Sequence, residues 1–299
     1  MDDIRARAIG PAERSGVLQP RNLERFCAQW IPPAHDIRDV VDTYWAVSWR
    51  LEPGEWIEQR IIDHPSITLS VERGDVTAPL LVSSARSTAW TRTISGSGDV
   101  FAIRLRPAGL PVVSDLNAAS IPHEREITAS LDARSHRLLQ QIAIAATPSR
   151  RAEAADALVR GLLAERPLGA SPRLANAALD AIVARPHVQR TSDVAAALGV
   201  SVRTLQRALR SHVGRGPGEI ARRVRLQEVV RRLSTADESL ADVAGELGYV
   251  DQAHLTHDFR AVAGITPGAY LRTLARADAA LAGRGHHDEA APTARMPRA

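Results

Sequence analysis

The sequence contains no lysine: all 38 of its basic residues are arginine. It has a single cysteine, Cys27, which excludes an intramolecular disulfide and a zinc site built on cysteines. No apolar run approaches the ~20 residues of a transmembrane helix. Residues 1–20 carry charges of both signs and lack the apolar segment of a secretory signal. We therefore expect a cytoplasmic protein without a membrane partner.

The positions of the arginines are more informative than their number. Genome composition can explain the choice of arginine over lysine, although arginine also suits phosphate and guanine recognition. Residues 171–281 hold 15 arginines against 11 acidic residues, and the rest of the chain is balanced. The whole formal net charge of +4 therefore lies in this region, where it favours contact with a nucleic acid.

Two stretches in the basic region are near copies of each other. Residues 193–199 and 242–248 both begin with Asp-Val-Ala and end with Leu-Gly. The offset is 49 residues up to the glycine and 50 residues from the next leucine, Leu205 against Leu255. A repeat of this length with a glycine between two helical segments predicts tandem helix-turn-helix units. Two plain helical hairpins are the alternative.

Capping residues and apolar spacing predict where the helices of this repeat lie. The expected helices are 174–184, one capped by Thr191 or Ser192 and ending at Gly199, one from Ser201 to about His212, one from Pro217 to about Leu233, one from Ser239 to Gly248, and one starting at Asp251. The central helix would be on the order of 25 Å long. A separation near the ~34 Å repeat of DNA is then within reach of the two units.

The second helix of each unit carries the candidate DNA-binding residues on its outward face. By helical spacing these are Val202, Arg203, Gln206, Arg207 and Arg210 in the first unit, and Gln252, Ala253, Thr256, His257 and Arg260 in the second. Arginine and glutamine can form paired hydrogen bonds with guanine and adenine edges. A solvated face is the alternative interpretation. Arg222, Arg223 and Arg225 of the central helix are expected to be solvated or close to phosphates.

Residues from about Leu174 to Arg272 resemble the DNA-binding domain of the AraC/XylS family of bacterial transcription regulators. The residues that carry the resemblance are 241–249, Asp251-Gln252, Leu255, Phe259-Arg260 and 264–272. The resemblance implies base reading by Arg203, Gln206, Arg207, Gln252, Ala253, Thr256 and His257, in the major groove of a double-stranded promoter or operator. It also implies contact with RNA polymerase and transcription activation, with repression left open as the alternative and a homodimer as a possibility.

The two reading faces are unequal. The family often has arginine at the position of His257, and histidine is shorter and only partly charged at neutral pH. The first face carries three arginines and a glutamine. We therefore expect the first unit to supply most of the sequence discrimination.

The N-terminal part has the pattern of short strands followed by helices. From about Asp42 to Leu105, alternating apolar residues and turn residues predict a small barrel or sandwich. Helical spacing follows at 131–146 and 151–165, with Ser149 as a possible N-cap; these helices are candidates for a dimer interface, or they pack on the sheet. The fold class is therefore α+β.

The predicted domains are a sensor or dimerisation domain (1–166), a linker (167–172), a DNA-binding domain (173–281) and a disordered tail (282–299). The segments around Tyr44-Trp45, 67–71 and 101–109 resemble an uncharacterised class of β-rich domains that precede the DNA-binding module in AraC-like regulators. This resemblance implies effector binding or dimerisation in this domain.

Candidate effector-binding residues are Trp45, Trp49, Trp56 and Trp90, although core packing is the alternative for each. His35, His64 and His123 lack the spacing of a metal site, so we expect no metal, no cofactor and no catalytic residue. Cys27 is expected to be a small buried apolar residue.

Two other functions are left open. The chain could be an enzyme with an AraC-like DNA-binding tail, such as a DNA-repair alkyl acceptor that uses its one thiol. It could also be a constitutive DNA-binding scaffold without a ligand.

Overall fold

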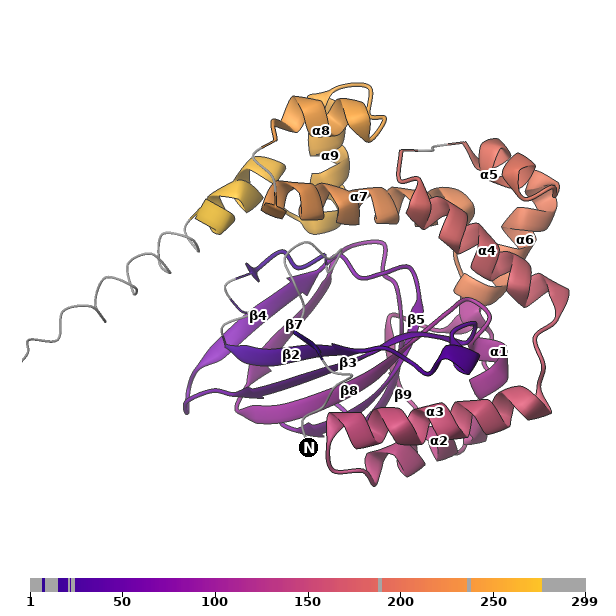
Figure 1. Ribbon diagram of the computed structural model, residues 1–299. Helices are drawn as coiled ribbons and strands as arrows, with labels where there is room; N and C mark the ends of the chain where they lie inside the picture. Colours follow the sequence, from indigo (N-terminus) through magenta and orange to yellow (C-terminus); the bar gives the residue numbers. More distant parts are fainter. Residues whose placement is uncertain are drawn as a thin grey trace, which may run out of the picture.

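The computed structural model describes residues 7–8, 16–20, 22, 25–187, 190–235 and 238–275. The fold is α+β, as the sequence predicts: a β-rich domain comes first and an all-α region follows (Figure 1). The predicted tail, 282–299, lies outside the described residues.

The β-rich domain contains a large antiparallel sheet and a separate strand pair. The strands are β1 (Arg7–Ala8), β2 (Phe26–Ile31), β3 (Val41–Arg50), β4 (Trp56–Ile61), β5 (Ile67–Gly74), β6 (Leu80–Ser84), β7 (Trp90–Ser95), β8 (Ser97–Leu105) and β9 (Glu124–Glu126). The large sheet has the order β1-β2-β3-β8-β5-β6-β9, and β4 pairs with β7 alone. The sheet curves, and the strand pair lies beside it (Figure 1).

Helices cover the outer face of the large sheet. Short turns α1 (Leu110–Val113), η2 (His35–Ile37) and η3 (Ala118–Ser120) accompany α2 (Ala133–Ala143) and α3 (Pro148–Glu165). Leu139 of α2 and Val159 of α3 are fully buried in one core with Tyr44 and Phe101 of the sheet. The apolar faces of the predicted helical hairpin therefore pack on the sheet, which leaves them unavailable to a partner subunit. The N-cap of α3 is Thr147, with Pro148 in the first turn, so Ser149 is not the cap.

The all-α region follows the predicted repeat closely. Its helices are α4 (Ala170–Ala184), α5 (Thr191–Ala197), α6 (Val202–Val213), α7 (Pro217–Thr235), α8 (Leu240–Glu246) and α9 (Gln252–Ala263), and residues 267–275 are also helical. Ser201, Ser239 and Asp251 cap α6, α8 and α9 with their side chains. Helix α5 begins at Thr191 itself, so neither Thr191 nor Ser192 is its cap. Helix α4 includes the last residues of the predicted linker.

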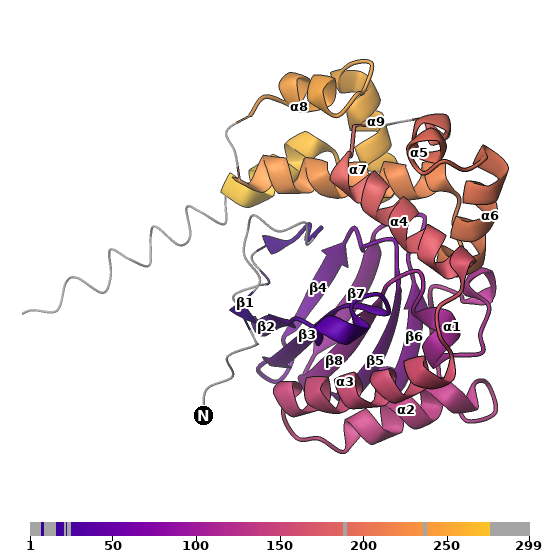
Figure 2. The same cartoon turned by 45° about the vertical axis from the view of Figure 1, so that its right-hand side comes forward.

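Helix α7 packs against the β-rich domain, so the two parts share a core. The helices α4–α9 arch over one side of the β-rich domain in both views, and α2 and α3 lie on the opposite side (Figures 1 and 2). Leu226 of α7 is fully buried in one cluster with Leu18 and Ile62 of the β-rich domain. The predicted exposure of Arg223 and Arg225 is therefore wrong: their exposed fractions are 6% and 8%.

Candidate functional site

The two helix-turn-helix units have the same backbone geometry. Gly199 and Gly248, the turn glycines, have φ of 65° and 75°, values that favour glycine. Gly214 and Gly264 end α6 and α9 in the same left-handed conformation. The amide hydrogen bonds also repeat: Gly199 to Ala196 O and Gly248 to Gly245 O (both 3.1 Å), Val200 to Ala195 O (3.0 Å) and Tyr249 to Ala244 O (2.9 Å).

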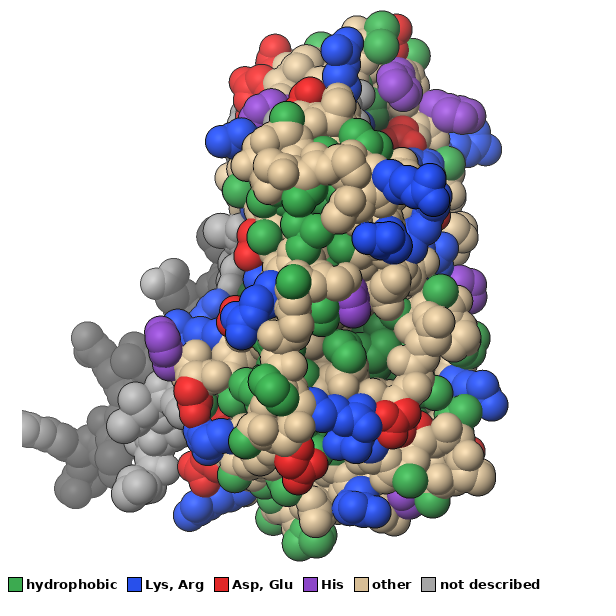
Figure 3. Space-filling view, turned by 90° about the vertical axis from the view of Figure 1, so that its right-hand side faces the viewer, with side chains coloured by type: hydrophobic (Ala, Val, Ile, Leu, Met, Phe, Trp, Pro, Cys, Tyr) green, Lys and Arg blue, Asp and Glu red, His purple; other side chains and the backbone are tan. Residues whose placement is uncertain are grey.

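Helix α6 buries one face and exposes an arginine-rich face. Leu205 and Leu209 are fully buried in the core of the first unit. Arg203, Arg207 and Arg210 are exposed, as is Val202, and Gln206 is half-buried. The side of the molecule that carries α5 and α6 shows arginine side chains projecting from its upper part (Figure 3). The five residues predicted for the first reading face thus share one surface.

Helix α9 is arranged in the same way with fewer charges. Leu255 and Phe259 are fully buried. Of the predicted reading residues, Thr256 is half-buried and the others, Gln252, Ala253, His257 and Arg260, are exposed.

The arginines of the reading faces differ from those of α7 in their partners. Within the described part of the all-α region, the ion pairs include none of Arg203, Arg207, Arg210 and Arg260. In contrast, Arg222 pairs with Asp258 at 2.5 Å, and Arg231 pairs with Glu228 at 2.6 Å. The guanidinium groups on α6 are therefore free to meet phosphates or base edges.

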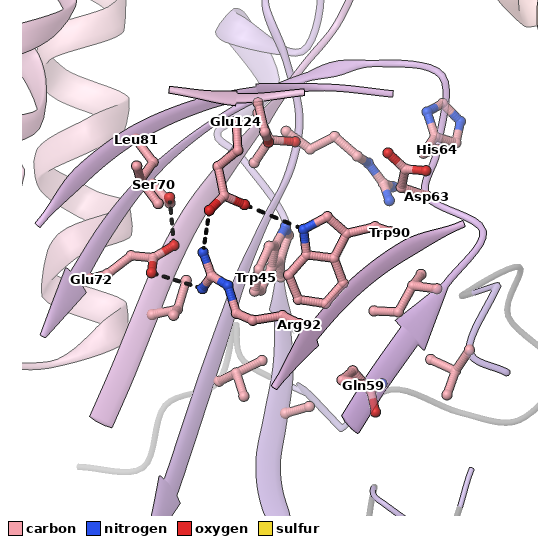
Figure 4. A pocket seen from close by; sticks show the side chains of 18 of the residues that line it. Trp45, Gln59, Asp63, His64, Ser70, Glu72, Leu81, Trp90, Arg92 and Glu124 are labelled. Atoms are coloured by element: carbon pink, nitrogen blue, oxygen red, sulfur yellow. Dashed lines mark hydrogen bonds and ion pairs between the residues drawn. The ribbon is translucent and has the colours of Figure 1, made fainter. Parts of the chain in front are cut away.

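The β-rich domain encloses a cavity of about 230 Å³ between the concave face of the large sheet and the β4–β7 pair. Trp45 and Trp90 line it (Figure 4), and so does Trp49. All three are among the residues that the sequence suggested for an effector site. Trp56 does not line the cavity: its side chain is 65% exposed. The strand period of two explains the difference, because Gln59 and Ile61 of β4 point into the cavity and the even-numbered residues point out.

The same alternation brings in residues that the sequence interpretation missed. Trp30 on β2, Glu72 on β5 and Arg92 on β7 line the cavity although each lies on a different strand. Alternation within each strand marks these positions as one face. However, that face can be identified as a cavity wall only when the strand pairing is known.

A charged cluster forms one wall of the cavity (Figure 4). Arg92 donates to Glu72 at 2.9 Å and to Glu124 at 2.8 Å. Glu72 also accepts a hydrogen bond from Ser70 at 3.1 Å, and Glu124 accepts one from Trp90 Nε1 at 3.3 Å. Burial raises the pKa of Glu72 above its usual value, and Arg92 offsets this effect only in part.

One residue of the all-α region also lines the cavity. Gln227 of α7 is 2% exposed and donates from Nε2 to the Ile62 carbonyl oxygen at 3.0 Å. One turn earlier on α7, Arg223 donates to the carbonyl oxygens of Asp63 and Arg86, both at 2.6 Å. Burial lowers the pKa of Arg223 to about 10, so the group keeps its charge at neutral pH. Helix α7 is thus in contact with the cavity wall.

Two different protein families match two separate segments of the chain, one in the β-rich domain and one in the all-α region. A family described as "Helix-turn-helix domain" matches residues 194–273, and a family described as "Domain of unknown function (DUF6597)" matches residues 29–125. The transcriptional activator RhaS of Pectobacterium carotovorum is 39% identical over 59 residues, which are 20% of this chain and 21% of that protein. The transcriptional activator NphR of a Rhodococcus species is 36% identical over 85 residues, 28% of this chain and 25% of that protein.

The all-α region is similar to a helix-turn-helix domain, and the relatives that the chain matches include proteins named as AraC-like transcription regulators.

Among solved structures, the DNA-binding domain of AdpA in complex with a target DNA is 30% identical, with 33% of this chain and 89% of that chain covered and a TM-score of 0.31. ToxT from Vibrio cholerae with a bound unsaturated fatty acid is 10% identical, with 77% and 95% covered and a TM-score of 0.43. The chain spans about a fifth to a third of the length of the curated relatives it matches.

Outside the all-α region, Cys27 is exposed on β2. The expectation that it is buried is wrong, because the neighbouring residues Phe26 and Ala28 face the cavity and Cys27 faces away. Among the described residues, no group of three or more His, Cys, Asp or Glu side chains could hold a metal ion. None of the described helices is long and apolar enough to cross a membrane.

Proposed function

We propose that this protein is a sequence-specific transcription regulator that binds double-stranded DNA through α6 and α9 and responds to a small-molecule effector in its β-rich domain. The observation that carries this proposal is the pair of matched units, whose exposed α6 arginines have no acidic partner among the described residues. Guanidinium groups in this setting can bind phosphates and guanine edges without first breaking an internal ion pair.

Effector control is supported by the cavity and its contact with α7. This helix joins the two units, and Gln227 places one of its side chains in the cavity wall. A ligand that alters the Gln227 contact would favour one arrangement of the two units over another, provided that it binds the two arrangements with different affinity. A metabolite screen by thermal shift tests this part, because a ligand that binds only the native state raises the unfolding temperature.

The remaining features follow from the AraC type. We propose that the protein acts in the cytoplasm as an activator that contacts RNA polymerase, and that a homodimer, if it forms, uses a surface other than the buried faces of α2 and α3. Relatives of the AraC-type domain include proteins named as transcriptional activators. A promoter–reporter assay with and without the gene distinguishes activation from repression.

The first prediction concerns the reading faces. A duplex is first selected from a random library with the full-length protein. We expect Arg203→Ala to weaken binding to this duplex by tenfold or more, since a bidentate contact is worth about 1–3 kcal/mol. Gln252→Ala should weaken binding less, because the reading face of the second unit carries fewer charged side chains. Fluorescence anisotropy at several salt concentrations measures both the affinity and the salt slope.

The matched control is Arg137→Ala, which removes an exposed arginine from α2 in the β-rich domain. It should leave binding unchanged although it alters the net charge equally. Equal affinities of the wild type, Arg203→Ala and Gln252→Ala would refute the assignment of both reading faces. Retained DNA binding in Cys27→Ala would set aside a role for the thiol in that activity.

A further inference from the structure

The charges of one cluster in the cavity wall do not cancel. Asp63 in the lining pairs with Arg223, and Arg104 pairs with Asp42 at 2.5 Å. In the remaining cluster, two carboxylates, Glu72 and Glu124, share the single guanidinium of Arg92. This cluster of three side chains therefore carries one surplus negative charge.

The surplus charge lies in a desolvated place. The Glu72 side chain is 4% exposed, and burial raises its pKa in spite of Arg92. A buried carboxylate without a full counter-charge is costly in the free protein. A positive charge brought into the cavity would lower that cost, whereas an anion would add to the repulsion or have to separate Arg92 from its carboxylates.

The rest of the wall suits the body of an organic cation. Phe26, Trp30, Trp45, Trp49 and Trp90 supply aromatic surface. The chain already places cations over two of these rings: Arg104 lies 5.3 Å from the Trp30 ring centre and Arg92 lies 5.4 Å from that of Trp90. No comparable contact is recorded for Trp45 or Trp49 among the described residues. Tryptophan faces attract ammonium groups most strongly among the aromatic side chains.

We propose that the cavity binds a small organic cation, with its ammonium group near Glu72 and Glu124 and its apolar part against Trp45 and Trp49. The volume of about 230 Å³ lies below the ~300–1,000 Å³ typical of ligand pockets, so the ligand is a small molecule. The role of this cation as the effector rests on the proposed function, whereas its binding to the cavity does not.

The test compares probes of similar shape and different charge on the full-length protein. The probes are benzyltrimethylammonium, phenylmethanesulfonate and neutral benzyl alcohol, and calorimetry and tryptophan fluorescence give their affinities. We expect the cation to bind at least tenfold more tightly than the anion. Absence of cation binding, or equal or tighter binding of the anion, overturns the proposal.

Variants then assign the selectivity to the carboxylates. Glu72→Gln should reduce cation affinity about tenfold without changing the affinity for benzyl alcohol, and Glu72→Gln with Glu124→Gln should invert the preference toward the anion. Glu126→Gln, an exposed carboxylate on the same strand as Glu124, is the matched control and should bind like the wild type. Unaltered selectivity in folded Glu72→Gln overturns the proposal. If Glu72→Gln does not fold, Glu124→Gln alone carries the test, with the same expected loss and the same refutation.

DNA binding is measured separately on the selected duplex, without any probe. If the protein binds the cation but does not bind DNA, this inference stands and the proposed function is refuted. If the protein binds DNA but does not bind the cation, the proposed DNA binding stands and this inference is refuted.

Discussion

The arginines of α6 and α7 differ in what their guanidinium groups contact. Arg203 and Arg207 are exposed, and neither forms an ion pair with a described residue, whereas Arg223 is buried against Asp63 and three backbone carbonyl groups. The residue type is the same, so its role depends on which face of which helix carries it. Helical spacing identified the outward face of α6 from the sequence. It could not identify the neighbour of α7, because that neighbour is separated by more than a hundred residues.

At the residue scale, Glu72 predicts how the stability of the protein depends on pH. The groups that face its carboxylate are Ser70, Arg92 and Glu124. Because its folded pKa is raised above the usual 4.5, its contribution to the free energy of unfolding is greatest below pH 4.5. The contribution is then lost as the pH rises through the raised folded pKa.

We therefore expect Glu72→Gln to become more stable relative to the wild type as the pH rises from 4 to 7. Urea unfolding at a series of pH values measures this difference, and Glu126→Gln serves as the exposed control. Parallel stability curves for Glu72→Gln and the wild type would show that the carboxylate is not perturbed.

At the scale of elements, the sequence predicts the ends of the helices well, but it does not predict which strands lie side by side. The helices α6, α7, α8 and α9 begin at or within a residue of the predicted positions, because caps and turn glycines act over a few residues of chain. The cavity wall is assembled from several strands, and its members are set by the sheet order β2-β3-β8-β5-β6. Tryptophan frequency alone therefore found three of its members and also named Trp56, which points outward.

The repeated C-terminal glycines of α6 and α9 allow a matched test of this local geometry. Gly214 and Gly264 have φ of 78° and 74°, so alanine is strained by about 1–2 kcal/mol at either position. At Gly214 an added Cβ would also lie 2.7 Å from the Ala118 carbonyl oxygen. At Gly264 it would meet only the end of the Arg60 side chain, at 3.4 Å.

We expect Gly214→Ala to lower the free energy of unfolding more than Gly264→Ala does. Chemical denaturation of the two variants measures the difference. A smaller loss at Gly214 would mean that the contact between α6 and η3 is not rigid.

At the scale of the whole molecule, the main feature is the contact between α7 and the β-rich domain. It includes the buried Arg223, Gln227 and a continuous apolar cluster around Leu226 and Ile62. Such a contact links the stability of the two parts, so we expect the wild type to unfold in a single transition. The bidentate pair between Arg106 and Asp180 (both bonds 2.7 Å) adds a second connection, but Asp180 is 57% exposed and the pair contributes less.

Two neighbouring arginines test this linkage. Arg223→Leu removes the partner of Asp63 and three hydrogen bonds to carbonyl groups, and we expect a loss of about 3–5 kcal/mol. It should also split thermal unfolding into two transitions. Arg222→Leu, which removes a 43% exposed side chain that pairs within the DNA-binding domain, should cost far less and keep one transition. Calorimetry decides, and similar losses in the two variants would contradict the role of Arg223.

The position of Gln227 and Arg223 bears on how the two parts of this chain can be recombined with parts of other proteins. Both side chains bind main-chain carbonyl groups of the β-rich domain, at residues 62, 63 and 86. Main-chain groups are present whatever the local sequence, but their placement depends on loop conformation. A chimera that joins this DNA-binding domain to a foreign sensor must therefore reproduce the path of two loops. A hybrid that exchanges α7 together with these two loops, rather than one joined at the linker, should preserve the contact between the two parts.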